Sequence, residues 1–447
     1  AQGPPDPRPA DAPADRFSAE RAMRHVRALA GGPRPVGTPA NARARRLLHR
    51  ELRALELEPE VQRRRLMWRR GRMVGTAVIR NVVARVEGEA STGAVALVAH
   101  HDTRVRTPGA ADDAAGVAAI LEALRALRPE LPLRNDLVVL FTDGEEPGLL
   151  GARAFTRSHR WSEDVAAVVN LEARGSSGAS LMFETGRPTA WSVERLARAD
   201  VRPVTSSLFD EVYRRLPNDT DFTLFRRAGR AGLNFAFIGG SEAYHMPLDT
   251  PERLSPASLQ HHGEAVLSLA RELGGADLTA VSGAGAGESP GRAPSGTAPS
   301  ALPGAGSATA GGGRDGAGPP AVFFTVPVAG LVRYPSWAAL LLAAALAVGL
   351  VVLVGRGRSS RRVTGRGIVA GLVAAPALVA LGAGGAWLLR EAALHVHPED
   401  GWFVARRLYR EGGYLVASVA GSAALVVGGL GLLRRWFSAP SLALGAV

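Results

Sequence analysis

Histidine, aspartate and glutamate recur in five short motifs, and these residue types bind metal ions and transfer protons. A single motif of this kind is usually a surface feature or a helix cap. Five together are different, because so many acidic groups would repel one another and would be costly to bury without partners. A pair of divalent cations resolves that conflict, and imidazole with carboxylate suits Zn²⁺. The motifs are His100-His101-Asp102, Asp112-Asp113, Glu145-Glu146, Asn170-Leu171-Glu172 and Tyr244-His245.

Short apolar segments predict the elements that must position these motifs. Apolar runs of strand length alternate with segments in which apolar residues recur at helical spacing. This alternation predicts an α/β fold with a mostly parallel, mixed sheet sandwiched by helices. In such sheets functional groups gather beyond the carboxyl ends of the strands, where the motifs lie. Predicted strands cover 77–86, 94–99, 136–141, 165–170 and 233–238, and predicted helices cover 116–127, 149–158 and 255–273.

Composition divides the 447 residues into four segments. Residues 1–16 are rich in Pro and Ala and are expected to be disordered. Residues 17–275 carry the predicted strands, helices and motifs, and are expected to form one globular domain. Residues 276–320 are expected to form a flexible linker rich in Gly, Ala, Ser and Pro. Residues 321–447 are expected to form a membrane region.

Three uncharged segments in the last region are each about the ~20 residues needed to cross a bilayer as a helix. A buried helix of a soluble domain is the alternative, but three such segments in succession argue against it. The predicted transmembrane helices cover 337–355, 367–389 and 413–433. They make the lipid bilayer an expected partner.

Arginines in the loop after the first span predict the orientation of the chain. The positive-inside rule places this loop in the cytoplasm, which puts the globular domain of a multi-pass membrane protein on the non-cytoplasmic face. Mixed charges between the second and third spans weaken the bias. The loop arginines are Arg356, Arg358, Arg361, Arg362 and Arg366.

Missing residue types exclude several kinds of chemistry. The chain has no Cys, which excludes a thiolate nucleophile, Cys-bound zinc and iron–sulfur clusters. It also has no Lys, which excludes a Schiff-base lysine and a P-loop lysine. The net charge of +12 suggests an acidic surface such as a membrane. No nucleic acid is expected as a partner, because aromatics are only 6% and no basic stripe is interleaved with them.

The order of the motifs resembles peptidase family M28, zinc metallopeptidases of the aminopeptidase type. The resemblance covers about residues 16–275 and includes His-x-Asp, Gly-Ala-x-Asp-Asp-x-x-Gly, Asp-Gly-Glu-Glu-x-Gly, Asn-x-Glu and Tyr-His. The flanking phrases are most similar to the membrane-anchored branch that includes vacuolar membrane protease and endoplasmic reticulum metallopeptidase. The resemblance implies a peptide substrate and two zinc ions per chain.

By position, the resemblance also implies the ligands of the two ions. Asp112 would bridge both ions, His100 and Glu172 would complete one site, and Glu146 and His245 would complete the other. Glu172 departs from the soluble aminopeptidases, which usually have Asp at this place. Since Glu is longer, the site that contains it could hold its ion differently.

The remaining motif residues would take part in catalysis. Glu145 would be the general base for a hydroxide that bridges the metals, and Tyr244 would donate a hydrogen bond to the oxyanion. Asp102 would support His100, and Asp113 would shape the turn beside the bridging carboxylate.

Three other functions compete with this interpretation. An M20-like deacylase or carboxypeptidase has a similar ligand order, but normally inserts a lid domain that does not fit between Glu172 and His245. A single-zinc glutaminyl-cyclase-like transferase would leave His100 and Glu172 without a role. An inactive peptidase fold that serves as a membrane receptor or scaffold would not need every ligand and the base.

Several further residues receive predictions of their own. Asp221 is expected either to cap the following helix or to lie in the pocket. Arg174 is expected to contact a substrate carboxylate or to form a structural ion pair. Asp249 is expected to support the loop that carries His245, whereas His261 and His262 are expected at the surface.

Overall fold

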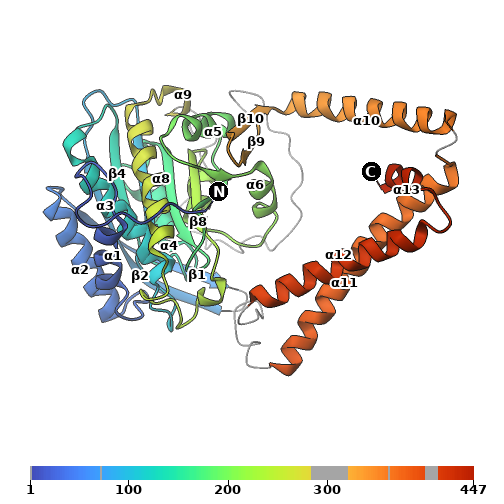
Figure 1. The fold of residues 1–447 in the computed structure, drawn as a ribbon. Coiled ribbons are helices and arrows are strands. Elements are labelled where there is room, and N and C mark those ends of the chain that lie inside the picture. Colours follow the sequence, from blue (N-terminus) through green and yellow to red (C-terminus); the bar gives the residue numbers. More distant parts are fainter. Residues whose placement is uncertain (1–2, 71–72, 283–320, 361–362, 398–410, 447) are drawn as a thin grey trace. The chain divides into compact units, whose positions relative to one another are not determined.

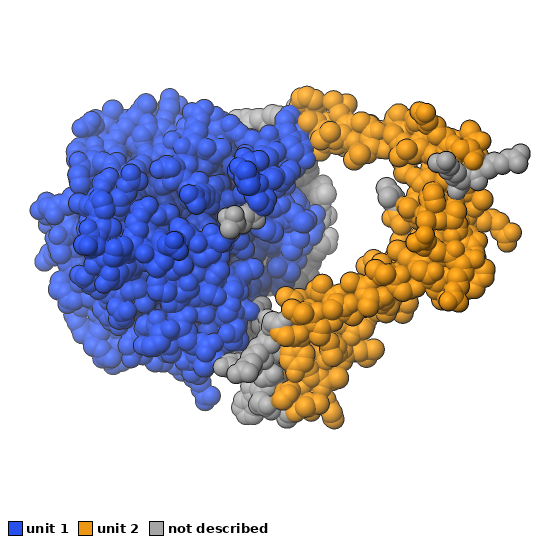
Figure 2. Space-filling model, viewed as in Figure 1, with its two compact units in different colours: residues 1–335 blue, residues 336–447 orange. Residues whose placement is uncertain are grey.

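The computed structural model describes residues 3–70, 73–282, 321–360, 363–397 and 411–446. These residues form two compact units, Ala1–Pro335 and Ser336–Val447 (Figure 2). The first unit contains all the chemical motifs, and the second contains the three long apolar segments.

The first unit is built on a mixed sheet with the strand order β1-β2-β4-β3-β5-β8-β6-β7 (Figure 1). Its centre is parallel, because β3 pairs with β4 and β5, and β5 pairs with β8. Antiparallel pairs flank this centre at β1–β2, β2–β4 and β8–β6. The predicted mixed α/β fold is therefore confirmed. The strands are Glu60–Arg70 (β1), Met73–Val86 (β2), Ala94–His100 (β3), Asp136–Thr142 (β4), Val165–Ala173 (β5), Leu181–Thr185 (β6), Val204–Thr205 (β7) and Ala231–Phe237 (β8).

The central strands are apolar on both faces because helices cover both faces. Val95 and Leu97 of β3 pack in the core with α1, α3 and α8, whereas Ala96 and Val98 pack with α4 and α7. Successive side chains of a strand point to opposite faces of the sheet, so the side chains on both faces of these strands are buried. The helices are Ala19–Leu29 (α1), Pro39–Ala54 (α2), Gly116–Leu127 (α3), Leu150–Ser158 (α4), Thr189–Arg198 (α5), Ser207–Tyr213 (α6), Asp221–Arg227 (α7), Pro256–Gly275 (α8) and Thr279–Ser282 (α9).

Hydroxyl side chains define where several of these helices begin. Ser18 accepts a hydrogen bond from the backbone of α1, and Thr38 does the same for α2. Ser255 caps α8, whose first residue is Pro256. A capping hydroxyl accepts a hydrogen bond from a backbone N–H that has no partner within the first helical turn. Proline at the first helical position costs no hydrogen bond, because the N–H that it lacks would have no partner within the helix.

The prediction of disorder for residues 1–16 is wrong for the described part of this segment. The Arg21 guanidinium donates hydrogen bonds to the carbonyl oxygens of Ala10, Ala12 and Arg16 at 2.7, 2.9 and 2.7 Å. The same side chain pairs with buried Glu122 at 2.8 Å. The segment is irregular but ordered, because its partners lie outside it and its own composition does not reveal them.

The first unit also extends beyond its predicted end at residue 275. Leu278 and Val281 are buried in its core, so the predicted linker begins too early. The rest of that linker, from residue 283 to 320, lies outside the described residues. Strands β9 (Ala321–Val326) and β10 (Gly330–Pro335) form an antiparallel hairpin, and Phe323 of β9 is buried in the same core. The prediction that the membrane region begins at residue 321 is therefore wrong, because this hairpin packs on the first unit.

The second unit consists of helices α10 (Ser336–Ser359), α11 (Gly365–Val396), α12 (Glu411–Leu433) and α13 (Ala439–Ala446). Three stretches are long and apolar enough to cross a membrane, namely Ser336–Ser359, Gly365–Val396 and Gly413–Leu433, with hydropathies of 2.8, 2.0 and 2.0. Ser422 of α12 donates a hydrogen bond to the carbonyl oxygen of Gly382 in α11, at 3.3 Å. Such small residues let membrane helices approach closely. The loop arginines Arg361 and Arg362 lie outside the described residues.

Candidate metal centre

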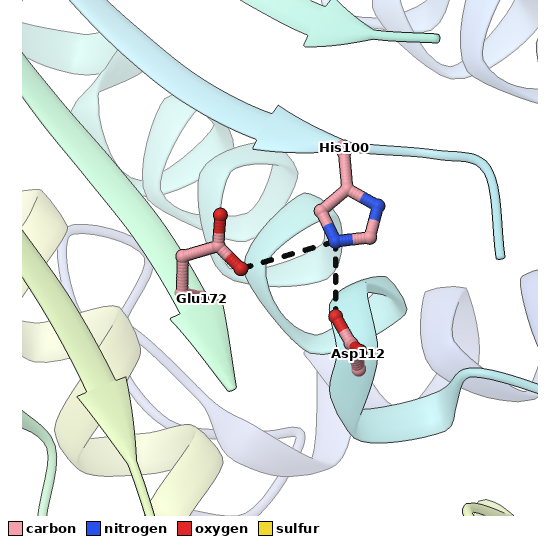
Figure 3. A group of neighbouring side chains, drawn as sticks. All are labelled: His100, Asp112 and Glu172. Atoms are coloured by element: carbon pink, nitrogen blue, oxygen red, sulfur yellow. Dashed lines mark hydrogen bonds and ion pairs between the residues drawn. The ribbon is translucent and has the colours of Figure 1, made fainter. Parts of the chain in front are cut away.

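Asp112 lies between two clusters of metal-binding side chains. Its Oδ1 is 2.9 Å from His100 Nε2, and its Oδ2 is 3.1 Å from His245 Nε2. Glu172 Oε2 lies 3.9 Å from His100 Nε2 (Figure 3). Glu146 Oε2 lies 3.3 Å from His245 Nε2. The five predicted ligand residues therefore form two groups of three that share Asp112.

The carboxyl ends of neighbouring strands bring these five residues together. His100 ends β3, Glu146 follows β4, and Glu172 lies near the end of β5. Since β3 pairs with both β4 and β5, these three positions meet at one edge of the sheet. Figure 3 shows His100 and Glu172 converging from their strands on Asp112, which lies in the turn before α3. His245 comes from the segment beyond β8.

A backbone contact fixes which nitrogen of His100 can bind a cation. His100 Nδ1 lies 3.1 Å from the carbonyl oxygen of Asp102. A carbonyl oxygen only accepts hydrogen bonds, so Nδ1 carries the hydrogen. In the neutral ring this leaves the lone pair of Nε2 facing Asp112 and Glu172, as in metal-binding histidines.

The Asp102 carboxylate mainly holds the turn after β4. It accepts hydrogen bonds from the backbone N–H groups of Gly144, Glu145 and Glu146, at 2.8, 3.0 and 3.4 Å. Its Oδ1 is 3.7 Å from His100 Nδ1, which is longer than any of these bonds. Support for His100 therefore comes from the Asp102 carbonyl, and the side chain positions the two glutamates.

Two further aspartates fix the backbone around Asp112. Asp113 Oδ2 accepts a hydrogen bond from the backbone N–H of His100, at 3.1 Å. Asp249 accepts from the N–H groups of Ala111 and Asp112, at 2.7 and 3.1 Å. Asp249 lies in the loop that carries His245, and these bonds tie that loop to the turn of Asp112. Spatial proximity to the Asp112 turn decides its role, and the two segments are far apart in the sequence.

The clusters concentrate more negative charge than their histidines neutralise. Burial raises the pKa of Glu145 well above its usual range, and the neighbouring Glu172 raises it further. Burial has the same effect on the pKa of Glu172. Burial lowers the pKa of His245, but the carboxylates of Asp112 and Glu146 outweigh it and raise the value to about 9. All these shifts indicate a site that lacks positive charge.

The residues present fit divalent cations such as zinc. Glu146 Oε1 is buried and accepts no hydrogen bond from a described residue. A buried carboxylate oxygen without a partner is costly, and coordination to a cation would satisfy it. Each group offers one imidazole and two carboxylates, which are ligand types that zinc takes in proteins.

Tyr244 and Arg104 border the group that contains His245. The Tyr244 ring stacks on the His245 ring, with centroids 3.7 Å apart. Burial raises the pKa of Tyr244, so its hydroxyl stays protonated and able to donate a hydrogen bond. Arg104 Nε lies 2.6 Å from Glu146 Oε2. Sequence reasoning missed Arg104, for which the only signal is its place just after the His-x-Asp motif.

Two side chains outside the clusters differ from their predictions, and for Asp221 one of the two predicted alternatives is excluded. His261 and His262 are buried, although they were predicted at the surface, because α8 is covered by chain on more sides than its apolar pattern indicates. His262 Nδ1 is 2.7 Å from Ser180 Oγ, and burial lowers the pKa of His262 to about 3. Asp221 is buried and accepts a hydrogen bond from Thr142, so it does not cap α7; the residue before it does.

A mixed α/β sheet with two cation-type clusters around a shared carboxylate at its carboxyl edge is typical of two-metal hydrolases. Residues 81–270 match the family model described as Peptidase family M28. Residues 81–270 are therefore the part of this chain that matches peptidase family M28.

The relatives of this domain carry the names of the predicted branch, endoplasmic reticulum metallopeptidase and vacuolar membrane protease, which confirms that prediction. The chain is 36% identical over 210 residues to endoplasmic reticulum metallopeptidase 1 of Rattus norvegicus, covering 46% of this chain and 23% of the relative. It is 30% identical over 237 residues to vacuolar membrane protease of Candida albicans, covering 52% and 28%. The chain thus spans less than a third of the length of these relatives.

Among solved structures, the fold is similar to an aminopeptidase from Aneurinibacillus sp. strain AM-1. The TM-score is 0.48 at 16% identity, and the match covers 57% of this chain and 94% of that chain.

Proposed function

We propose that this chain is a membrane-anchored metallopeptidase that binds two zinc ions and hydrolyses peptide bonds as an aminopeptidase. The observation that carries the proposal is Asp112, whose two oxygens face His100 and His245 at 2.9 and 3.1 Å. A carboxylate shared by two ligand groups could serve both ions of a two-metal site.

Five side chains would hold the ions. His100 and Glu172 would complete one site with Asp112, and Glu146 and His245 would complete the other. Bound zinc would lower the pKa of a water molecule and polarise the substrate carbonyl.

The other residues of the site would handle the proton and the oxyanion. Glu145 takes a proton from the attacking water and returns it to the leaving amine. The Tyr244 hydroxyl donates a hydrogen bond to the developing oxyanion, where one such donor contributes roughly 3–4 kcal/mol. Asp102 fixes the backbone of Glu145 and so limits the motion of the base.

The membrane location is proposed from the second unit and from the relatives. Three apolar helices are long enough to span a bilayer, and the named relatives belong to the endoplasmic reticulum and the vacuolar membrane. Arg356 and Arg358, at the end of α10, favour a cytoplasmic loop after the first span. We therefore place the peptidase domain of a multi-pass protein on the non-cytoplasmic face. The resemblance of the motifs to the aminopeptidase type supports cleavage from the amino terminus of the peptide.

Metal content and hydrolysis together test the proposal. The full chain in detergent is expected to carry two zinc ions by mass spectrometry and to release nitroaniline from alanine and leucine p-nitroanilides. A chelator should stop the reaction and added zinc should restore it. Glu172→Gln and His245→Gln should each lower the zinc content by one, whereas Asp112→Asn should lower it by two, because Asp112 serves both groups.

Two outcomes would contradict the proposal. Little bound zinc and no hydrolysis of any peptide would favour an inactive scaffold. Release of N-acyl groups or C-terminal residues without cleavage of the aminoacyl anilides would favour an M20-like deacylase or carboxypeptidase.

A further inference from the structure

Arg174 directly follows β5 and lies at the same edge of the sheet as the two groups of candidate metal ligands. Its backbone N–H donates to the carbonyl oxygen of Phe237 at the end of β8, at 3.0 Å, so its backbone is anchored between two strands. Its guanidinium carbon lies 4.9 Å from the centroid of the Tyr244 ring. Because Tyr244 in turn stacks on His245, the three side chains form one continuous stack that leads from the candidate metal site to Arg174.

The charge of Arg174 is not neutralised by any described residue. Its side chain forms no salt bridge and no hydrogen bond within the described part of the chain, and it is half-buried. Arg104, by contrast, pairs with Glu146 at 2.6 Å. The alternative prediction of a structural ion pair for Arg174 therefore has no support. The Tyr244 ring holds the guanidinium by a cation–π contact and leaves its N–H donors free.

The free donors suit a carboxylate. The planar guanidinium matches the two oxygens of a carboxylate, and the pair is stronger than a neutral hydrogen bond. The distances of 3.7 and 4.9 Å along the stack place the guanidinium within the length of about two to three extended residues from the His245 ring. A carboxylate on a short peptide could therefore reach Arg174 while a peptide bond lies at the metal site.

We propose that Arg174 binds a carboxylate of the substrate and makes the enzyme prefer short peptides with a negative charge near the scissile bond. This inference rests on the proposed peptidase function. The carboxylate can be the free C-terminus of a dipeptide or an acidic side chain. In either case Arg174 determines specificity and takes no part in bond cleavage.

Three matched peptides test the preference and identify the carboxylate. The zinc-loaded full chain is assayed with Ala-Ala, with its amide Ala-Ala-NH2, and with Ala-Asp-NH2. Arg174→Ala is expected to lower kcat/KM about 10–100-fold for the peptide whose carboxylate it binds, as for other hydrogen bonds to charged groups, and to change Ala-Ala-NH2 less than about twofold. A loss confined to Ala-Ala identifies the C-terminus, and a loss confined to Ala-Asp-NH2 identifies the side chain. Arg174→Lys should retain part of the preference.

The matched control is Arg157→Ala. Arg157 is exposed near the end of α4, which leads into the amino end of β5, the opposite end from the site. This variant loses the same charge and should leave all three rates unchanged. An equal loss on all three peptides in Arg174→Ala would show that Arg174 only positions Tyr244, and unchanged rates would show no role; both results overturn the inference.

A binding measurement separates this inference from the proposed function. In the Glu145→Gln background, calorimetry with Ala-Ala and Ala-Asp-NH2 should show about 10–100-fold weaker binding of the selected peptide after Arg174→Ala. If the wild type cleaves none of the peptides but this difference is found, the peptidase proposal fails and the carboxylate site stands. If binding is the same with and without Arg174, the carboxylate site fails whatever the wild type hydrolyses.

Discussion

Glu145 is positioned through its backbone and not through its own carboxylate. Asp102 accepts the Glu145 N–H at 3.0 Å and also holds the adjacent residues Gly144 and Glu146. The Glu145 carboxylate itself forms no salt bridge or hydrogen bond with a described residue, and burial raises its pKa. A carboxylate that is held in place but not engaged is free to exchange a proton, which is what a general base must do.

We expect Glu145→Gln to lower kcat by about 10²–10⁴-fold, because the amide cannot take a proton from water. The zinc content should not change, since Glu145 belongs to neither ligand group. Hydrolysis of aminoacyl p-nitroanilides and metal analysis by mass spectrometry check both statements. Glu252→Gln, at an exposed position, makes the same chemical change and should have no effect. Turnover near the wild-type level in Glu145→Gln would eliminate this assignment.

Helix α8 carries an acid-sensitive group into the core. His262 is fully buried, with its Nδ1 2.7 Å from Ser180 Oγ and its ring edge-on to Phe237. Its Nε2 has no hydrogen-bond partner among the described residues. Protonation would place a charge there without a counterion, and burial therefore lowers the pKa of His262 to about 3.

This depressed pKa predicts the direction of a stability change with pH. Below its ordinary pKa of 6.5, the unfolded chain protonates His262 while the folded chain does not until about pH 3. The stabilisation is therefore complete above about pH 6.5 and is lost toward pH 3, by about 1.4 kcal/mol per pH unit. We expect His262→Gln, which does not titrate but can still bond to Ser180, to flatten the pH dependence of the melting temperature between pH 6.5 and 4.5.

The control for this experiment is His49→Gln on α2, at a position that is not fully buried. It should keep the wild-type pH dependence. Loss of zinc at low pH acts on all three proteins, so the difference between the variants isolates His262. The same pH dependence in His262→Gln as in the wild type would show that the ring is already accessible to protons.

At the scale of the whole molecule, the two units require different surroundings. The first unit buries its apolar side chains around the sheet, whereas Leu340, Leu341 and Leu346 of α10 are exposed within the chain. Lipid can cover such a helix, because all its backbone groups are satisfied internally. The chain has no Cys, so a single introduced cysteine reports the side of the membrane on which it lies.

We expect Ala54→Cys and Ser360→Cys to react with a membrane-impermeant maleimide from opposite sides of the membrane. Ala54 is exposed at the end of α2 in the first unit, and Ser360 is exposed after α10, close to Arg356 and Arg358. In intact cells, Ala54→Cys should be labelled directly and Ser360→Cys only after permeabilisation, if the domain lies on an external face. In membranes of an internal compartment, sealed cytoplasmic-side-out vesicles should show the reverse order. Labelling of both from one side would contradict the proposed orientation.

Local patterns in the sequence were sufficient to predict the central strands and the five side chains that gather around Asp112. A strand buried on both faces is apolar along its length, as 94–99 is and as 136–141 is after Asp136, so a short window shows it. A polar strand such as β1, with its arginine-rich sequence, has no such pattern and was missed. The ligands could be placed together because parallel strands end at one edge of the sheet.

Only the tertiary structure decided which segments these residues touch. Asp249 bonds to the turn before Asp112, and the N-terminal segment is held by Arg21. His262 is enclosed in the core, and Arg174 stacks on Tyr244 without an ion pair to any described residue. Each of these contacts joins residues that are distant along the chain. Residue type and periodicity express the preference of a short segment, but the burial and the partner of a side chain depend on the other segments that fold against it.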